Sequence, residues 1–327
     1  SKCTMWRRGL RALPAASGAI FCLPRPAWCE AHRHDSGDRF NARPELQQHV
    51  MRHRSAYDEH RIPFAARALR LRFVHSNAPQ AVAEYERLVR IFSEVFPMNL
   101  DESDNPDVVI SLGGDGFLLS TLRAFPTVPV YGINCGHVGF LTNEKRDELR
   151  AMRLLREVHN ANRVMLPLLQ VSVNGTPPVF AFNEVVVARS STQAAHLSVE
   201  VNGETVVPFL CGDGILVATP CGSTAYNLSA GGYILPLSSD LLALTPICPY
   251  RPRHLPCALL DGKDLVKINN LDPESKRPLR VSYDDMTFPE PVTSIDLRRS
   301  DRVGILLLDN DSEHRIFMER FSVGEKD

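Results

Sequence analysis

Hydrophobic residues in the first half of the chain come in short runs and in helically spaced sets, which predict strands and helices in turn. The stretch 65–74 ends in an apolar strand-like run, and the next apolar side chains recur at helical spacing over 81–95. A second run, 108–112, leads through a glycine-rich turn into an amphipathic helix over 117–125, and a third strand is expected at 128–133. Runs this short and apolar are typical of parallel strands covered on both faces. The pattern therefore predicts a small parallel α/β unit, whose ligands bind at the carboxyl ends of the strands.

The second half of the chain has strand-like runs joined by tight-turn signals. The pairs Asn174-Gly175 and Asn202-Gly203 each stand between two such runs, and the run after the first pair extends over 179–187. Asn and Gly both accept the positive φ that a two-residue hairpin turn requires. This half is therefore expected to be mostly antiparallel β structure. A polar helical stretch over 144–162 is the expected connection between the two halves.

Together these patterns predict the fold class: an α/β N-terminal domain with a parallel sheet, followed by a β-rich, β-sandwich-like C-terminal domain. We expect the first domain over residues 63–150, with the glycine-rich turn, and the second over 151–327. The last segment of the chain is a candidate to pack back on the first domain.

Residues 1–62 form an expected N-terminal extension. From Trp6 the sequence is rich in Arg, Ala and Pro, has no acidic residue before Glu30, and lacks a continuous apolar core. Such a composition fits an organellar transit peptide better than a secretory signal, and it fits an untargeted extension as well. We therefore expect a mitochondrial or other organellar location, with a cytoplasmic one as the alternative.

Charge and composition narrow the classes of partner. The chain has 37 basic and 38 acidic side chains, a net charge of −1, so no overall field attracts nucleic acid or an anionic membrane. No apolar run approaches the roughly 18 residues of a membrane span. The eight cysteines show no C-x-x-C pair and no Cys/His cluster at zinc spacing, so we expect reduced core cysteines and no protein-bound structural metal.

The turn Gly113-Gly114-Asp115-Gly116 is the strongest candidate for chemistry, because it follows a buried strand and precedes a helix. Glycines let the backbone approach an anion, and the helix offers free N–H groups and the positive end of its dipole. A carboxylate in such a loop repels phosphate, so Asp115 needs another role, which is either to accept a hydroxyl proton or to hold a divalent cation. The alternative is a tight turn in which Asp tolerates an unusual backbone angle. The turn is neither a P-loop nor a G-x-G-x-x-G motif.

Two further segments stand out in the second half. From Asp213 to Gly232 an apolar strand lies between an acidic turn and a loop rich in Gly, Ser and Thr, which exposes N–H groups and hydroxyls in one place. Tyr226 in this loop could stack on a purine ring, or it could be a core or cap contact. Asn183-Glu184 interrupts an apolar strand, which ligand binding and exposure at a sheet edge explain equally well.

In this order and spacing, the motifs resemble those of the NAD kinase family over about residues 70–323. The motifs that carry the resemblance are Gly113-Gly114-Asp115-Gly116, Gly132-Ile133-Asn134, Gly139-Phe140-Leu141, Asn183-Glu184 and the stretch from Asp213 to Gly232. The later segment Tyr250-Arg251-Pro252-Arg253 looks like the proteobacterial branch of the family. Cys221 stands where the family usually has Thr. Asp284-Asp285 stands where many members have Asp-Gly, a difference that we interpret as a matter of the turn and hardly of the chemistry.

The resemblance implies a phosphotransferase that phosphorylates the 2′-hydroxyl of the adenosine ribose of NAD with ATP and Mg²⁺, giving NADP. Asp115 would accept or orient the proton of that hydroxyl, while Mg²⁺ neutralises the phosphates. By the same resemblance, Gly113, Gly114 and Gly116 would let the triphosphate approach, and Asn183 and Glu184 would hold the ribose and nearby groups of NAD. Asp213 would bind toward the nicotinamide end of NAD. The residues implied around adenine are Ser223, Thr224, Ala225 and Tyr226.

Two alternatives of other kinds stay open at this point. One is a lipid kinase of the wider superfamily, acting on diacylglycerol or a sphingoid base, although Asn183-Glu184 and the loop at 222–226 match the NAD-binding members instead. The other is a catalytically silent NAD(P)-binding protein, which retention of Asp115 disfavours. The resemblance also implies a homodimer or homotetramer whose contacts lie in the β-rich, NAD-binding domain.

Overall fold

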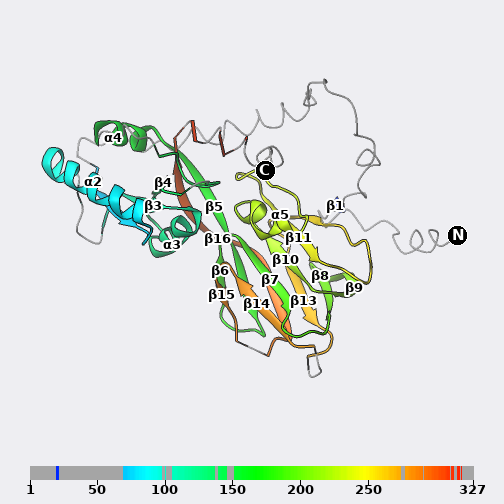
Figure 1. Cartoon of the computed structure of the whole chain (residues 1–327). Helices are drawn as coiled ribbons and strands as arrows, with labels where there is room; N and C mark the ends of the chain where they lie inside the picture. The colour runs from blue at the N-terminus through cyan, green and yellow to red at the C-terminus, as the bar shows by residue number, and fades with distance from the viewer. Residues whose placement is uncertain are drawn as a thin grey trace, which may run out of the picture. The chain divides into compact units, whose positions relative to one another are not determined.

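The computed structural model describes residues 20–21, 69–97, 100, 105–136, 139–145, 151–273, 277–289, 291–309, 311–312, 315–316 and 318. Its contacts divide the chain into two compact units (Figure 1). The α/β unit holds the described residues from 69 to 166, 236–238 and those from Arg302 onward. The β unit holds Pro167–Leu235 and Ser239–Asp301 together with strand β1.

The α/β unit is built on parallel strands. Strands β2 (Leu71–His75), β3 (Val108–Gly113) and β4 (Val130–Asn134) lie side by side in that order, and all six residues of β3 are buried. The C-terminal end of β16 (Ser294–Leu308) adds a fourth parallel strand, with Leu306 opposite Val130. The expected parallel sheet is therefore confirmed, and its last strand comes from the far end of the chain.

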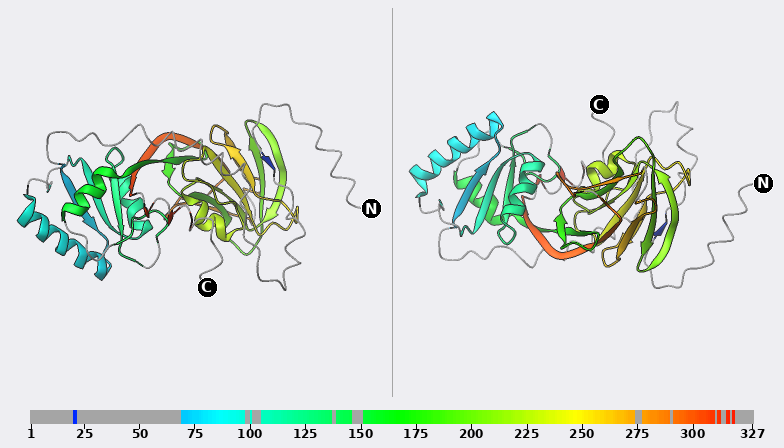
Figure 2. Two further views of the ribbon diagram at one scale, coloured as in Figure 1. Left: turned by 90° about the horizontal axis from the view of Figure 1, so that it is seen from above. Right: turned by 90° about the horizontal axis from the view of Figure 1, so that it is seen from below.

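Helices cover both faces of this sheet, and alternation along the strands decides which residues meet which helix. Helices α2 (Pro79–Val95) and α4 (Ala151–Asn160) share one hydrophobic core with residues such as Ile110 and Tyr131. Helix α3 (Asp115–Ala124) meets the opposite face, where the Ser111 hydroxyl lies 3.0 Å from that of Thr121. Figure 2 shows α2 running along the outside of these strands.

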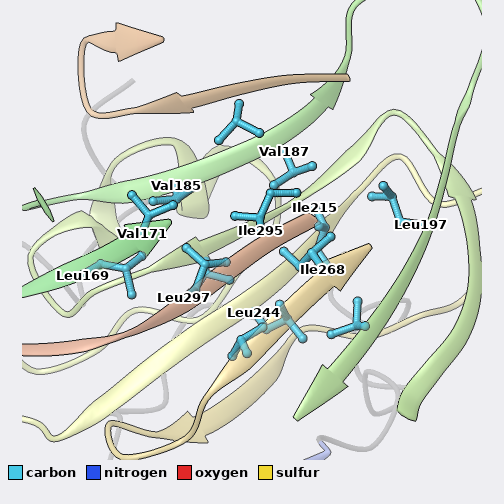
Figure 3. Close-up of a cluster of buried hydrophobic side chains, with 14 of the residues drawn as sticks. Leu169, Val171, Val185, Val187, Leu197, Ile215, Leu244, Ile268, Ile295 and Leu297 are labelled. Carbon is cyan, nitrogen blue, oxygen red and sulfur yellow. The ribbon is translucent and has the colours of Figure 1, made fainter. Parts of the chain in front are cut away.

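The β unit consists of two antiparallel layers. One is a seven-stranded sheet in the order β1-β12-β11-β10-β7-β14-β15, and the other contains the first part of β16, then β13, β8 and β9. Side chains such as Val185 and Ile215 from the first layer pack against Leu197, Ile268 and Leu297 from the second (Figure 3). The strand bounds are β1 Ile20–Phe21, β7 Glu184–Arg189, β8 Ala195–Val201, β9 Glu204–Gly212, β10 Gly214–Ala218, β11 Leu241–Ile247, β12 Ala258–Asp261, β13 Val266–Asn270, β14 Leu279–Tyr283 and β15 Met286–Thr287. This architecture confirms the expected sandwich-like, antiparallel second half.

Both predicted hairpin turns are present. Asn174 and Gly175, with φ of 52° and 72°, join β5 (Asn162–Val173) to β6 (Val179–Ala181), and Asn202 and Gly203 join β8 to β9 in the same way. The expectation of one strand over 179–187 is wrong. The chain bends at Phe182 and Asn183, and a separate strand, β7, begins at Glu184.

Other expectations concern termini, cysteines and membranes. The expected extension over residues 1–62 lies outside the described residues except for Ile20–Phe21, which pairs with β12. The five described cysteines are all free, and three of them are buried. Within the described part of the chain, no helix is both long and apolar enough to span a membrane.

Candidate active site

The glycine-rich turn adopts the predicted strand–turn–helix geometry. Gly113 ends β3, Gly114 caps the helix, and Asp115 is the first residue of α3. Gly114 has φ −95° and ψ −176°, an ordinary extended conformation, and none of the four turn residues has a positive φ. The alternative interpretation, a tight turn with an unusual backbone angle at Asp115, is therefore wrong.

Space around the glycines differs along the turn. A Cβ added at Gly113 would lie 3.0 Å from Phe117, so this glycine permits close packing of strand and helix. A Cβ added at Gly114 or Gly116 would meet nothing within 4 Å. Neither packing nor backbone angle requires glycine at these two positions, so their missing side chains leave open space at the N-terminus of α3.

The Asp115 carboxylate is held by a loop distant in sequence. Its Oδ2 accepts the Phe140 N–H at 2.6 Å, and its Oδ1 accepts the Leu141 N–H and the Thr142 hydroxyl, both at 3.2 Å. Burial raises the pKa of Asp115, and these hydrogen bonds act in the opposite direction. The N-terminus of α3 also favours negative charge there. The result is a partly buried carboxylate in a fixed orientation beside open glycines.

In the β unit, Asn183 and Glu184 lie where the chain bends into β7. The carboxylate of Asp284 fixes this bend, because its two oxygens accept the N–H groups of Phe182 and Asn183 at 2.8 and 2.7 Å. Asp284 therefore fixes the conformation of the Asn183-Glu184 segment. Our interpretation of the difference from Asp-Gly, which lies at Asp285, as a matter of the turn stays a prediction.

Glu184 is buried, with 9% of its surface exposed, and β7 lies between β10 and β14 inside the sheet. Exposure at a sheet edge therefore does not explain this carboxylate. Its Oε2 is buried and has no hydrogen-bond partner among the described residues. Burial, with a further contribution from the charge of Asp284, raises the pKa of Glu184 to about 7. A buried carboxyl oxygen without a donor is suited to a ligand that brings one, such as a sugar hydroxyl.

The Gly/Ser/Thr-rich loop is locked onto the same bend. The Thr219 hydroxyl donates to the Phe182 carbonyl at 2.5 Å and accepts the Gly222 N–H at 3.2 Å. A Cβ on Gly222 would lie 2.3 Å from the carbonyl oxygen of Asn183, so only glycine allows this approach. The structure thus brings Asn183, Glu184 and the start of the loop together.

The loop residues differ in what they present. Ser223 is fully buried, and its hydroxyl binds the Pro220 carbonyl at 2.8 Å and the Leu235 N–H at 3.0 Å. Tyr226, the first residue of α5 (Tyr226–Ser229), is 43% exposed. Of the four residues expected around adenine, Ser223 has its hydroxyl committed inside the protein, whereas Thr224, Ala225 and Tyr226 retain exposed surface.

The Asn227 side chain holds this loop through hydrogen bonds, a role that the sequence did not reveal. Its amide donates to the carbonyls of Ser223 and Tyr233, both at 3.0 Å, and its Oδ1 accepts the Thr245 hydroxyl at 2.7 Å. Asn227 is fully buried, so these bonds are shielded from water.

Asp213 lies apart from the other predicted residues of the β unit. In the β7–β10 pair, Gly214 is opposite Ala188 while Ala218 is opposite Glu184, which places Asp213 and Glu184 at opposite ends. Asp213 precedes Gly214, so five residue steps of about 3.4 Å place it roughly 17 Å from Glu184 along the strands. Asp213 pairs with Arg189 at 2.6 Å. Its role toward the nicotinamide end stays a prediction.

Two family models match the chain: the ATP-NAD kinase N-terminal domain matches residues 5–162, and the ATP-NAD kinase C-terminal domain matches residues 182–287. The NAD kinase of Xanthomonas oryzae pv. oryzae is 42% identical over 263 residues, which cover 78% of this chain and 98% of that relative. The NAD kinase of Xylella fastidiosa strain 9a5c is 40% identical, covering 78% of this chain and 97% of that relative.

Solved structures support the architecture. Yeast NADH kinase complexed with NADH has a TM-score of 0.67 at 19% identity, covering 80% of this chain and 89% of that chain. An NAD kinase from Archaeoglobus fulgidus in complex with ATP has a TM-score of 0.63 at 24% identity, covering 78% of this chain and 100% of that chain. At these identities the likeness shows the fold alone.

Proposed function

Because the chain belongs to the ATP-NAD kinase family, we propose that it transfers the γ-phosphoryl group of ATP to the 2′-hydroxyl of the adenosine ribose of NAD, giving NADP. The enzyme class is accordingly NAD⁺ kinase, rather than a lipid kinase or a silent NAD(P)-binding protein. The observation that carries this conclusion is the match over almost the whole length of relatives that are NAD kinases.

Asp115 is the residue that we assign to the transfer itself. In the reaction, the 2′-oxygen forms a bond to the γ-phosphorus, the bond to the β,γ-bridging oxygen breaks, and ADP leaves. The hydroxyl proton passes to the Asp115 carboxylate, which must therefore be ionised and correctly oriented. The hydrogen bonds from Phe140, Leu141 and Thr142 support both requirements.

The triphosphate is assigned to the N-terminal end of α3, where Gly114 and Gly116 leave open space. We propose that Mg²⁺ arrives as part of the ATP substrate and neutralises phosphate charge. This arrangement is typical of Mg²⁺, which usually binds substrate phosphates and few protein ligands.

NAD is assigned to the β unit. The Oε2 of Glu184 is suited to accept a ribose hydroxyl, and Asn183 lies beside it at the bend that Asp284 holds. Thr224, Ala225 and Tyr226 are the proposed neighbours of adenine, and Tyr226 offers its exposed ring for stacking. The buried Ser223 supports the loop from within.

A coupled assay tests the proposal directly. The purified chain is incubated with NAD, ATP and Mg²⁺, and NADP is measured with an NADP-specific dehydrogenase. We expect continuous NADP formation, and we expect Asp115→Asn to lower it at least about 100-fold while NAD affinity stays within about threefold. No NADP from the intact protein would refute the kinase, whereas full activity of Asp115→Asn would remove only Asp115 from the mechanism.

The proposed partner is a second copy of the chain, as a homodimer or homotetramer. Strand β9 ends the order of its sheet, and Phe209 on it is 40% exposed. An edge strand with an exposed aromatic ring is suited to contact with another chain. Light scattering after size-exclusion chromatography measures the mass, and a monomer at micromolar concentration would contradict this partner.

A further inference from the structure

Arg315 contacts the loop that holds Asp115, from the opposite side. The N–H groups of Phe140 and Leu141 and the Thr142 hydroxyl point to the Asp115 carboxylate. The carbonyl groups at the two ends of the same loop, Gly139 and Thr142, accept Nη1 and Nη2 of Arg315 at 3.1 and 2.9 Å. One guanidinium therefore bridges both ends of the loop whose N–H groups bind Asp115.

This bridge restricts the shape of the loop. A guanidinium is planar and presents its N–H groups in a rigid fork, so two carbonyls can bind it together only when they are correctly placed. The loop is also closely packed, because a Cβ on Gly139 would lie 2.0 Å from the Thr142 hydroxyl and 3.2 Å from Asp115. Small changes in the loop therefore move the donors that hold the carboxylate.

The segment that carries Arg315 is itself anchored to the α/β unit. The Asp309 carboxylate accepts the Ser312 N–H at 2.8 Å and the Tyr131 hydroxyl at 3.2 Å. The Asp309 N–H donates to Asn143 at 2.9 Å, and Asn143 is fully buried next to the loop. Arg315 thus extends from a fixed base rather than from a free chain end.

We propose that Arg315 is a positioning residue for phosphoryl transfer: it fixes the loop 139–142, and the loop fixes the Asp115 carboxylate toward the reacting hydroxyl. This inference rests on the proposed function, since positioning by Arg315 matters for catalysis only if Asp115 takes part in the transfer. Arg315 acts through the loop and not on the substrate.

The test compares Arg315→Ala and Arg315→Lys in the full chain. Misplacing a catalytic group by a fraction of an ångström is costly, so we expect Arg315→Ala to lower kcat about tenfold while KM for NAD stays within about twofold. The loop's hydrogen bonds act to lower the pKa of Asp115, so their weakening moves the acid limb of the kcat profile to higher pH. Lysine carries its donors on a single nitrogen and lacks the planar fork whose two nitrogens reach Gly139 and Thr142 separately, so the kcat of Arg315→Lys should lie between those of the wild type and Arg315→Ala.

Two controls separate positioning from stability. Arg153→Ala removes another arginine of the α/β unit, one that pairs with Glu157 on α4, and should leave kcat and the acid limb unchanged. Leu154→Val destabilises the core of the same unit and should lower the melting temperature without moving the acid limb. Arg315 variants that behave like Leu154→Val would overturn the proposal.

The outcomes also distinguish this inference from the proposed function. If the intact chain makes NADP and Asp115→Asn does not, but Arg315→Lys keeps the wild-type kcat and acid limb, only the role of Arg315 fails. If Asp115→Asn is fully active, the catalytic assignment fails first. Arg315→Lys also keeps the test decisive if Arg315→Ala does not fold.

Discussion

Replacing Glu184 with Gln tests the electrostatics of the buried carboxyl in the β unit. Gln has nearly the same shape but cannot ionise, so the substitution removes one titration and keeps the packing. Glu184 is 9% exposed and lies beside the negative charge of Asp284, so its ionised form is poorly solvated in the folded protein.

The size of the effect follows from the pKa. Its rise from the ordinary 4.5 to about 7 corresponds, at about 1.4 kcal/mol per pH unit, to roughly 3 kcal/mol. The folded protein holds this proton more tightly than the unfolded chain does. Protonated Glu184 therefore stabilises the folded protein relative to the unfolded chain. This stabilisation is complete below about pH 4.5 and is lost as the pH rises through about 7.

Urea unfolding of the ligand-free protein between pH 5 and pH 8.5 measures this linkage. We expect the stability of Glu184→Gln relative to the wild type to increase across this range by up to about 3 kcal/mol. Glu204→Gln is the matched control, because Glu204 is exposed on β9 and its loss should leave the wild-type pH dependence intact. If Glu184→Gln and the wild type change in parallel with pH, the buried carboxyl does not titrate as argued.

Three further substitutions address the site. Thr142→Val removes one hydroxyl donor to Asp115, so it should lower kcat about threefold to tenfold and move the acid limb to higher pH. Thr142→Ser keeps the hydroxyl and should keep the wild-type kcat and acid limb. Steady-state kinetics against pH would refute this if the two variants behaved alike. In Gly114→Ala the added Cβ would meet no atom within 4 Å, so we expect an unchanged or higher melting temperature. The same methyl group would occupy the space assigned to the triphosphate, so KM for ATP should rise about tenfold. An unchanged KM would argue against triphosphate at this turn. Gly222→Ala would place Cβ 2.3 Å from the Asn183 carbonyl oxygen, so it should lower both the melting temperature and the affinity for NAD. Calorimetry measures both quantities. Wild-type values for both would show that the loop can move to accept the methyl group.

Local sequence patterns were sufficient for the two hairpin turns and for the place of Asp115. Asn174-Gly175 and Asn202-Gly203 predict their hairpins because the turn depends only on the φ angles of two residues. Asp115 could be placed at a helix start because strand, glycines and helix follow one another directly in the chain. Such features need no knowledge of tertiary structure.

The partners of these residues could not be predicted, because they are distant in sequence. Thr142 reaches Asp115 across 27 residues, and Asp284 reaches Asn183 across 101. Arg315 reaches Gly139 across 176 residues. Each contact depends on how strands and loops are brought together, which periodicity along the chain does not encode.

Long-range contacts explain what the sequence could not show near Asn183-Glu184. The sequence showed one apolar run, but the N–H groups of Phe182 and Asn183 bind Asp284 instead of a neighbouring strand, so the run is broken there. Edge exposure stays open beside ligand binding at the level of the sequence, because the run gives no sign that β10 and β14 flank Glu184 on both sides.

The late position of the fourth parallel strand has a consequence for biosynthesis. Residues from Arg302 onward complete the α/β unit, with Leu306 beside Val130 and Asp309 bound to Tyr131. The ribosome therefore releases the glycine-rich turn nearly 200 residues before the segment that supports it. A nascent or truncated polypeptide that ends before Arg302 would contain Asp115 but lack that support, so the ability to phosphorylate a substrate should arise only after residues 302–315 have been synthesised.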